Sequence, residues 1–117
     1  MIKGTGIDII EISRFKKIYD KFGSRLLKKI FNNDEIPKYK NKNKYISSLA
    51  GKFAAKEAIS KALGTGFGNN LSFLDIKILN LSSGQPYVVY KNNNQGYFHI
   101  SISHSKENAI ASAIVEI

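Results

Sequence analysis

The spacing of the hydrophobic residues changes near residue 70. Residues 2–10 alternate, which predicts a strand with Ile7 and Ile9 on one face. Asp8 falls on the other face, among glycines that would leave room for a ligand. From Ser13 to residue 31 apolar residues recur every three or four positions, which predicts two helices divided at Gly23. The apolar stripe of the first helix consists of Phe15, Ile18, Tyr19 and Phe22.

Short elements then lead to the longest helix. Breakers and capping residues set their expected limits. The expected elements are a second helix capped by Ser24 and carrying Leu26, Leu27, Ile30 and Phe31, a third turn capped by Asp34 and interrupted by Pro37, an exposed loop over 38–44, and a helix over 44–63 that the Gly-Thr-Gly-Phe-Gly segment 64–68 stops.

One carboxylate is out of place on the long helix. At about 100° per residue, Glu57 falls near the centre of an apolar arc and Lys61 lies beside it. An unpaired buried charge is costly, so Glu57 should pair with a cation or bind a metal ion. An i, i+4 ion pair with Lys61 and a metal site with Asp8 are both open interpretations. The residues of the apolar arc are Ile46, Leu49, Ala50, Phe53 and Ala54.

After residue 70 the hydrophobic period becomes two. This alternation predicts strands over 74–78, 87–90, 98–102 and 109–117, separated by Ser-Gly and Asn-rich turns. Helices followed by an antiparallel sheet form an α+β arrangement. The chain shows no internal repeat or linker, so we expect a single domain over 1–117.

The composition limits the classes of protein that the chain can belong to. A chain of 117 residues buries a smaller fraction of its surface than a larger one, so oligomerisation would help it. No apolar run approaches the roughly 18 residues that a membrane span needs. Asp8 and Glu11 interrupt the segment where a signal peptide would be apolar, so we expect a cytosolic protein. The absence of cysteine excludes disulfides and thiolate chemistry.

The net charge of +9 is unevenly distributed. Residues 1–63 hold 15 Lys or Arg against 6 Asp or Glu, whereas residues 64–117 hold 3 against 3, so all of the excess lies in the helical half. Such a surface would steer an acidic partner toward the helices. Sixteen of the 18 basic residues are lysine, and this bias can also reflect an AT-rich genome.

Several blocks of sequence resemble the holo-acyl-carrier-protein synthase family, and they occur in the same order as in that family. Those near the start are Gly-Ile-Asp-Ile-Ile-Glu-Ile at 6–12, followed by Arg14, and Leu-Ala-Gly-Lys-Phe-Ala-Ala-Lys-Glu-Ala at 49–58. The later ones are Lys-Ala-Leu-Gly-Thr-Gly at 61–66, Ser-Phe-Leu-Asp-Ile at 72–76, Gly-Gln-Pro at 84–86 and Ile-Ser-Ile-Ser-His-Ser-Lys at 100–106. Because the blocks extend from residue 6 to the last strand, coincidence is a poor explanation.

The resemblance implies a reaction. Members of the family move the 4'-phosphopantetheine arm of coenzyme A to a serine of apo acyl carrier protein, in lipid biosynthesis, and release adenosine 3',5'-bisphosphate. The family forms trimers with active sites between subunits. Attack at a pyrophosphate depends mainly on positioning and on neutralising charge. Mg²⁺ suits that task because it takes one or two carboxylates together with substrate phosphates.

The resemblance also assigns roles to individual residues. Asp8 and Glu57 match the two metal carboxylates of the family. The residues that match its coenzyme site are Lys52, Phe53, Lys61, Gly64, Gly66, Gly84, Gln85, Pro86, His104 and Ser105. The basic residues expected to bind the acidic carrier protein are Arg14, Lys17, Lys21, Arg25 and Lys28, of which the two arginines fall where the family contacts its partner.

Some of these positions have simpler interpretations. Gly64 and Gly66 first of all stop a helix, because a phosphate-binding P-loop precedes its helix and ends in Gly-Lys-Ser/Thr. A lone histidine at a strand end, such as His104, is usually structural, although the family match favours phosphate binding. Lys52 replaces the usual arginine of the family, so a bidentate phosphate contact is lost. Gln85 replaces the usual lysine, which removes one positive charge.

The sequence assigns no catalytic base. Asp34 and Glu35 lie in a loop region of a suitable kind, and a metal-bound water is an alternative. A basic α+β module for nucleic acid is a competing function, prompted by the net charge and by Tyr39, Tyr45 and Phe53 near lysines. The aromatic residues follow helical core spacing or lie in one loop, which argues against it. An inactive scaffold of the same fold is a third alternative, against which the intact metal pair argues.

Overall fold

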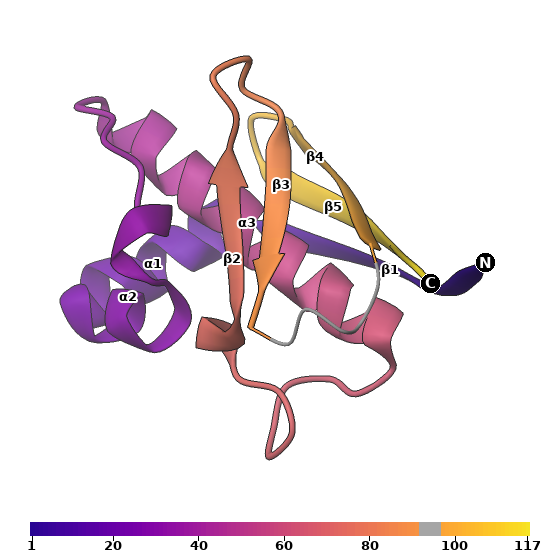
Figure 1. Ribbon diagram of the computed structural model, residues 1–117. Coiled ribbons are helices and arrows are strands. Elements are labelled where there is room, and N and C mark those ends of the chain that lie inside the picture. Colours follow the sequence, from indigo (N-terminus) through magenta and orange to yellow (C-terminus); the bar gives the residue numbers. More distant parts are fainter. Residues whose placement is uncertain (92–96) are drawn as a thin grey trace.

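The computed structural model describes residues 1–91 and 97–117, and it has the expected α+β arrangement (Figure 1). The longest helix packs across a three-stranded sheet, with two shorter helices near its N-terminal half and a β-hairpin beside it. In chain order the elements are β1 (Ile2–Glu11), α1 (Ile12–Phe22), α2 (Ser24–Ile30), a 3-10 turn (Asn33–Glu35), α3 (Lys42–Leu63), a second 3-10 turn (Phe73–Asp75), β2 (Ile76–Asn80), β3 (Pro86–Tyr90), β4 (Tyr97–His104) and β5 (Asn108–Glu116).

The strands form two antiparallel sheets, whereas the sequence predicted one. The larger sheet has the order β1-β5-β4, and β2 pairs with β3 in a separate hairpin. The first strand of the chain therefore pairs with the last, so that Asp8 lies opposite Ala111. Pairing over such a separation is not encoded in the local alternation of residues, which explains why the prediction missed it.

Several predicted boundaries shift because other residues form the caps. α3 begins at Lys42, since the Asn41 side chain accepts a hydrogen bond from the Lys44 amide at 3.0 Å. Gly23 stands in the capping position expected of Ser24, and Asn32 forms a capping box with Glu35 in place of Asp34. The Asn-rich turn expected between β3 and β4 falls on residues 92–96, outside the described residues.

α3 is the centre of the core, and it is buried on nearly all sides. Its alanines pack against alanines of β5 in one cluster, and its N-terminal half packs against α1 and α2 in another. The prediction of a single apolar arc centred on Glu57 is therefore wrong, since Glu57 is only half-buried. The charged residue of α3 that is fully buried is Lys56, whose side chain is 0 % exposed.

β1 lies unusually close to α3. A Cβ atom on Gly4 would stand 2.0 Å from the Ala62 carbonyl oxygen, and one on Gly6 would stand 1.9 Å from the Ala58 carbonyl oxygen. The space beside these glycines is thus filled by the helix backbone. The prediction that the space is left for a ligand is wrong, and the glycines instead bring Asp8 up to α3.

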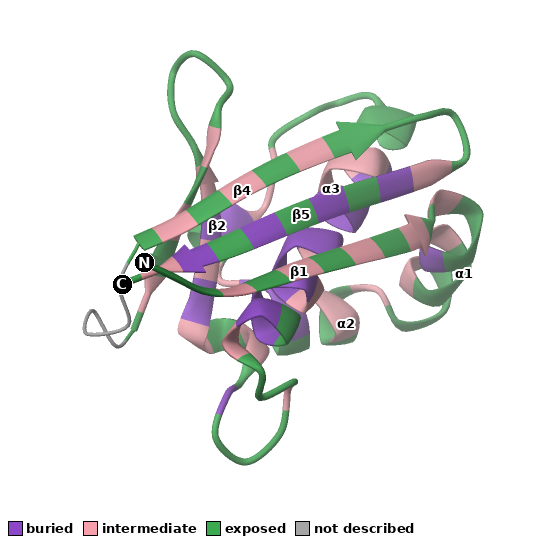
Figure 2. Ribbon diagram, turned by 90° about the vertical axis from the view of Figure 1, so that its right-hand side faces the viewer, coloured by how far each residue is buried: buried purple, intermediate pink, exposed green. Residues whose placement is uncertain are grey.

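The opposite face of the larger sheet is exposed (Figure 2) and carries four isoleucines. Ile7, Ile9, Ile110 and Ile114 project from it, each between 37 % and 62 % exposed. The alternation predicted for β1 is therefore confirmed, with Ile7 and Ile9 on the outer face. No helix in residues 1–91 and 97–117 is long and apolar enough to cross a bilayer.

Candidate functional site

Asp8 of β1 and Glu57 of α3 are brought together beside Lys61. The Lys61 ammonium donates to Asp8 Oδ1 at 3.2 Å and to the Ile7 carbonyl oxygen at 2.9 Å. Lys61 therefore ties α3 to the edge strand. Lys61 thus pairs with Asp8 rather than with Glu57, the i, i+4 partner that was one of the two open interpretations. Its positive charge still acts on Glu57 from nearby.

The two carboxylates repel each other in a half-buried place. Burial raises the pKa of Glu57, the Asp8 charge raises it further, and Lys61 opposes both effects. Asp8 is 15 % exposed, and within the part of the chain that the structure describes its Oδ2 atom is buried without a hydrogen-bond partner. A cation between the carboxylates would satisfy that oxygen and remove the repulsion. The donor set fits Mg²⁺, which uses few carboxylates when phosphates complete its shell.

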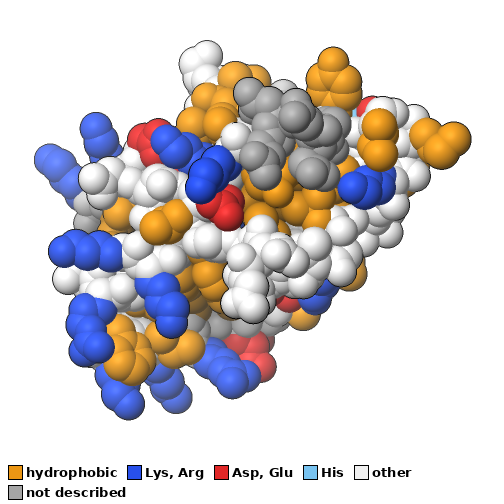
Figure 3. Space-filling view, turned by 60° about the horizontal axis from the view of Figure 1, so that its bottom comes forward, with side chains coloured by type: hydrophobic (Ala, Val, Ile, Leu, Met, Phe, Trp, Pro, Cys, Tyr) orange, Lys and Arg blue, Asp and Glu red, His pale blue; other side chains and the backbone are white. Residues whose placement is uncertain are grey.

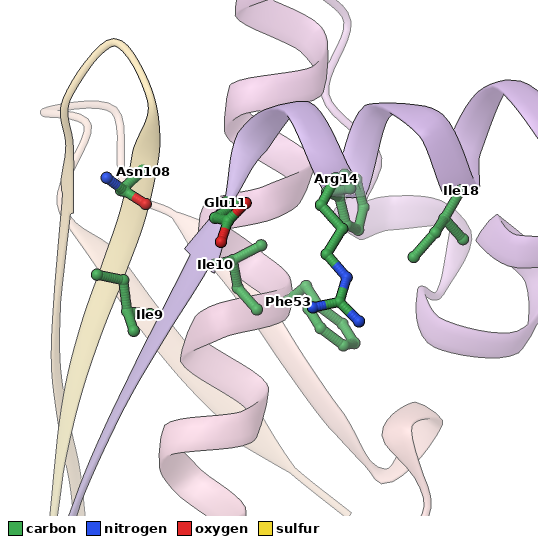
Figure 4. A pocket seen from close by; sticks show the side chains of 8 residues that line it. Ile9, Ile10, Glu11, Arg14, Ile18, Phe53 and Asn108 are labelled. Atoms are coloured by element: carbon green, nitrogen blue, oxygen red, sulfur yellow. The ribbon is translucent and has the colours of Figure 1, made fainter.

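A pocket of about 350 Å³ opens between β1, α1 and α3 (Figure 4). Ile10 lies on the same strand face as Asp8, and Phe53 lies one helical turn before Glu57, so both lining residues adjoin the pair. Arg14 of α1 extends toward Phe53. The pocket therefore lies between α1 and residues that neighbour the carboxylates in β1 and α3.

A second cavity, of about 290 Å³, lies at the other edge of the larger sheet. β4 forms that edge and β1 forms the opposite one, with α3 packed across the sheet between them. The predicted coenzyme residues are therefore divided between two separate places. Those that line the second cavity are Lys52, Gly84, Pro86 and His104.

His104 and Ser105 differ in how their side chains are used. The His104 Nε2 atom lies 2.9 Å from the Ser47 carbonyl oxygen, so the ring is anchored to α3 while it lines the cavity. The Ser105 hydroxyl accepts a hydrogen bond from the Asn108 amide at 3.0 Å and shapes the turn between β4 and β5. Ser105 thus has a structural role that its sequence match did not indicate.

The glycine-rich positions follow the elements that they end. Gly64 is the left-handed C-cap of α3, and its amide donates to the Lys61 carbonyl oxygen at 3.0 Å, so the predicted helix stop is confirmed. Gly66 follows two residues later. Gln85 lies in the turn between β2 and β3, next to Gly84 of the second cavity.

Comparison with known proteins agrees with this geometry. A sequence model described as the 4'-phosphopantetheinyl transferase superfamily matches residues 4–115. The chain belongs to this superfamily. The family resemblance inferred from the sequence blocks, the α+β class of this transferase and its interpretation as an enzyme are all confirmed.

Relatives of this transferase match over nearly their full length. The holo-[acyl-carrier-protein] synthase of Chlorobaculum tepidum is 46 % identical over 112 residues, which are 95 % of this chain and 96 % of that protein. The crystal structure of the Bacillus anthracis holo-(acyl-carrier-protein) synthase in complex with CoA (3',5'-ADP) has a TM-score of 0.85 at 41 % identity and covers 98 % and 96 % of the two chains. The Helicobacter pylori synthase in complex with coenzyme A has a TM-score of 0.87 at 39 % identity and covers 96 % and 99 %.

Sequence reasoning missed a buried ion pair in this transferase. The Lys56 ammonium donates to Glu35 Oε2 at 2.8 Å and to the carbonyl oxygens of Ile30 and Phe73, and both charged side chains are 0 % exposed. The other Glu35 oxygen accepts the Ile78 amide at 2.8 Å. Burial lowers the pKa of Lys56, and the Glu35 carboxylate opposes that shift. The signal in the sequence was a lysine inside the densest apolar stretch of the chain.

This network changes the interpretation of three candidate residues. Glu35 is enclosed by its partners, so it cannot accept a proton from a substrate serine, and it is excluded as the base. Asp34 is exposed and bonds Lys77 at 2.9 Å. Lys52 donates to the Glu35 carbonyl oxygen, and burial lowers its pKa. Lys52 therefore supports the 3-10 turn as well as lining the second cavity.

The aromatic residues that suggested a nucleic-acid module are mostly parts of the core. Tyr45 packs edge-on against Tyr19, and Phe53 stacks on Phe73 at 5.7 Å between ring centroids. Tyr39 is 52 % exposed, beside Lys44. One exposed ring is a poor platform for stacked bases, so the nucleic-acid alternative is not favoured.

Basic side chains gather at the end of this transferase that holds α1 and α2 (Figure 3). The five predicted carrier-binding residues are all exposed, as expected. The apolar stripe of α1 is only partly buried, however, because Ile18 and Phe22 are 40 % and 42 % exposed. They line a groove of about 430 Å³ together with Arg25, Leu26 and Lys29. Of the stripe predicted from the sequence, Phe15 is thus buried, whereas Ile18 and Phe22 remain partly exposed.

Proposed function

We propose that this chain transfers 4'-phosphopantetheine from coenzyme A to a serine of apo acyl carrier protein, with Mg²⁺, and releases adenosine 3',5'-bisphosphate. One observation carries the proposal: in a member of this superfamily, Asp8 and Glu57 meet beside Lys61 with a buried carboxylate oxygen unpaired among the described residues. This role belongs to lipid biosynthesis. A cytosolic location and a single domain over 1–117 stay predictions.

The donor set is consistent with a metal ion shared between protein and substrate. In the described part of the chain, no group of three or more His, Cys, Asp or Glu side chains is placed to hold a metal ion. Asp8 and Glu57 would hold Mg²⁺, leaving the remaining positions to water and phosphate oxygens. When bound, the ion supplies positive charge to the pyrophosphate that is attacked. Lys61, already beside Asp8, adds a mobile positive charge for the leaving group.

The predicted coenzyme-binding residues form two sets, and within one chain these sets lie apart. Phe53 and Lys61 lie on the β1 side, near the carboxylate pair, and Gly64 and Gly66 follow the C-terminal end of α3. Lys52, Gly84, Pro86 and His104 line the second cavity, and Gln85 and Ser105 are their neighbours in sequence. Because α3 lies between the sets, a coenzyme held by both is better accommodated between two copies.

A trimer would supply such a shared site. The exposed isoleucines of the larger sheet, Ile7, Ile9, Ile110 and Ile114, offer the apolar surface that association would bury. We propose that copies of the chain meet through this face. Sedimentation should show a trimer at assay concentration, whereas a fully active monomer at nanomolar concentration would refute the shared site.

The carrier protein would dock on α1 and α2. Acyl carrier proteins are strongly acidic, and this end of the molecule is basic with exposed apolar residues at its centre. The pocket lined by Arg14 and Phe53 lies between this surface and the residues that neighbour the carboxylate pair, and we propose that the carrier serine approaches the phosphate through it. The group that takes the serine proton stays unassigned.

Mass spectrometry of apo acyl carrier protein incubated with the chain, coenzyme A and Mg²⁺ tests the proposal. The expected product is the carrier increased by the mass of phosphopantetheine. Asp8→Ala and Glu57→Ala should fold but lose transfer, since each removes one of the two carboxylates. Near wild-type rates in either variant at limiting Mg²⁺ would exclude the metal assignment. A steep salt dependence of binding to nucleic acid without transfer would favour the basic module.

A further inference from the structure

Gly51 occupies a position in α3 where a glycine needs a reason. It lies in the middle of a helix of 22 residues and is fully buried. Glycine is among the weakest helix formers, because it loses more backbone entropy than alanine does. Its neighbours in the helix include Ala50, Ala54 and Ala55, so small size alone does not account for the choice.

The reason lies in the ring of His104. A Cβ atom on residue 51 would stand 2.6 Å from His104 Nε2 and 3.1 Å from Cε1 of the same ring. It would also stand 2.9 Å from the Ile102 Cγ2 atom. Real Cβ contacts are longer than this, so an alanine would force the His104 ring away from the helix. The His104 ring occupies the space that a side chain at position 51 would fill.

A second contact fixes how the ring is turned. His104 Nε2 lies 2.9 Å from the carbonyl oxygen of Ser47, one helical turn before Gly51. A carbonyl oxygen only accepts hydrogen bonds, so Nε2 must carry the hydrogen. Nδ1 is then the ring nitrogen left for a ligand of the second cavity, which His104 lines.

We propose that Gly51 is a positioning residue for the transfer reaction: it allows the His104 ring to lie against α3 with Nε2 bonded to Ser47, and so presents Nδ1 to the coenzyme. The proposal rests on the proposed function in one respect, namely that the ligand of this cavity is coenzyme A. The orientation of the ring in the free protein does not depend on that function.

Ring ¹⁵N spectra of the wild-type protein are the first test, because they need no variant. Without ligand, His104 should show the tautomer protonated on Nε2. Added coenzyme A should shift the Nδ1 resonance more than the Nε2 resonance. A ring protonated on Nδ1, or one that exchanges between both tautomers, would overturn the proposed orientation.

Gly51→Ala supplies the kinetic test. It should keep its fold by circular dichroism, change the His104 spectrum and raise the KM for coenzyme A about tenfold, with a change below twofold in the KM for the carrier. In a His104→Ala background the same substitution should change the KM for coenzyme A less than twofold, because the ring that it displaces is gone. Gly68→Ala is the matched control, since a Cβ atom there would meet nothing within 4 Å.

The outcomes separate the inference from the proposed function. Equal damage from Gly51→Ala in both backgrounds would overturn the inference, because the contact with Ile102 would then be the important one. A changed ring spectrum with an unchanged KM for coenzyme A, in an enzyme that still transfers, would overturn the assignment of Nδ1 to the coenzyme. Failure of the wild-type chain to transfer would defeat the proposed function, and the apo spectrum would still decide the position of the ring.

Discussion

Gly6 and Ala58 touch through their backbones, so that a Cβ atom on Gly6 would stand 1.9 Å from the Ala58 carbonyl oxygen. This contact brings the edge strand of the larger sheet against the central helix. Asp8 lies two residues beyond Gly6 on the same strand face, and Glu57 precedes Ala58. The distance between the two carboxylates is thus set by a glycine that takes no part in the chemistry.

Gly6→Ala should therefore damage both stability and transfer. The added methyl group meets rigid backbone, so we expect a loss of about 3 kcal/mol in the free energy of unfolding. The variant should also need more Mg²⁺ for half-maximal transfer, because β1 and α3 move apart. Urea unfolding and a Mg²⁺ titration measure the two effects. Gly68→Ala, where a methyl group meets open space, is the control, and equal behaviour of the two variants would contradict the prediction.

Local pattern was sufficient for most elements of this fold. Alternation located β1, and the left-handed C-cap at Gly64 ends α3 where the glycine predicted it. Caps were less predictable, because Asn41 and Asn32 compete with neighbouring polar residues of similar propensity. The pairing of β1 with β5 could not be predicted, since the residue pattern of a strand does not specify which other strand it pairs with.

The site residues could be predicted only where the residue type alone is unusual for its position in the sequence. Asp8 and Glu57 could be singled out as carboxylates among apolar neighbours. The partner of Lys56 could not be found, because Glu35 is 21 residues away in a segment without clear periodicity. For the same reason the contact between His104 and Gly51 could not be predicted. It forms only because β4 packs against α3 in the folded chain.

Lys56→Met should be among the most damaging single changes. It leaves the Glu35 carboxylate buried without its cation, which typically costs about 3–5 kcal/mol. Chemical denaturation measures the loss. Adding Glu35→Gln should restore part of it, because the uncompensated charge is then removed.

Lys77→Met is the matched control for that experiment. It breaks the ion pair between Lys77 and Asp34, whose side chains are 36 % and 52 % exposed. Exposed pairs contribute about 0–1 kcal/mol, so the change should be small. Similar losses for Lys56→Met and Lys77→Met would show that the buried pair is not special.

The pKa of Glu57 should report the repulsion between the two carboxylates. Burial and the Asp8 charge raise its pKa, so the folded protein holds this proton more tightly than the unfolded chain. Stability from this group is present below the unfolded pKa and is lost as pH rises through the folded pKa. In carboxyl ¹³C spectra, Glu57 should titrate at higher pH than in the unfolded chain. Asp8→Asn should lower that midpoint without fully normalising it, because burial remains; an unchanged midpoint would contradict the repulsion.

Arg25→Glu tests the charged part of the carrier surface. Arg25 is exposed at the groove of α1 and α2, away from the carboxylate pair. Reversing a rim charge mainly slows association, so the KM for the carrier should rise severalfold and its dependence on salt should flatten. Lys91→Glu makes the same charge change on an exposed side chain next to β3 and should have a smaller effect. Equal effects would mean that net charge alone attracts the carrier.

Phe22→Ser tests the apolar part of the same surface. The Phe22 ring is 42 % exposed beside Ile18, an arrangement that the free protein tolerates and that a docked partner would cover. Aromatic residues at the centre of an interface contribute strongly to affinity, whereas those on a free surface add little to stability. The KM for the carrier should therefore rise about tenfold at every salt concentration, while the KM for coenzyme A and the melting temperature stay nearly constant. If the melting temperature fell and the carrier KM did not change, the ring would belong to the fold of α1, and the docking surface would have to lie elsewhere.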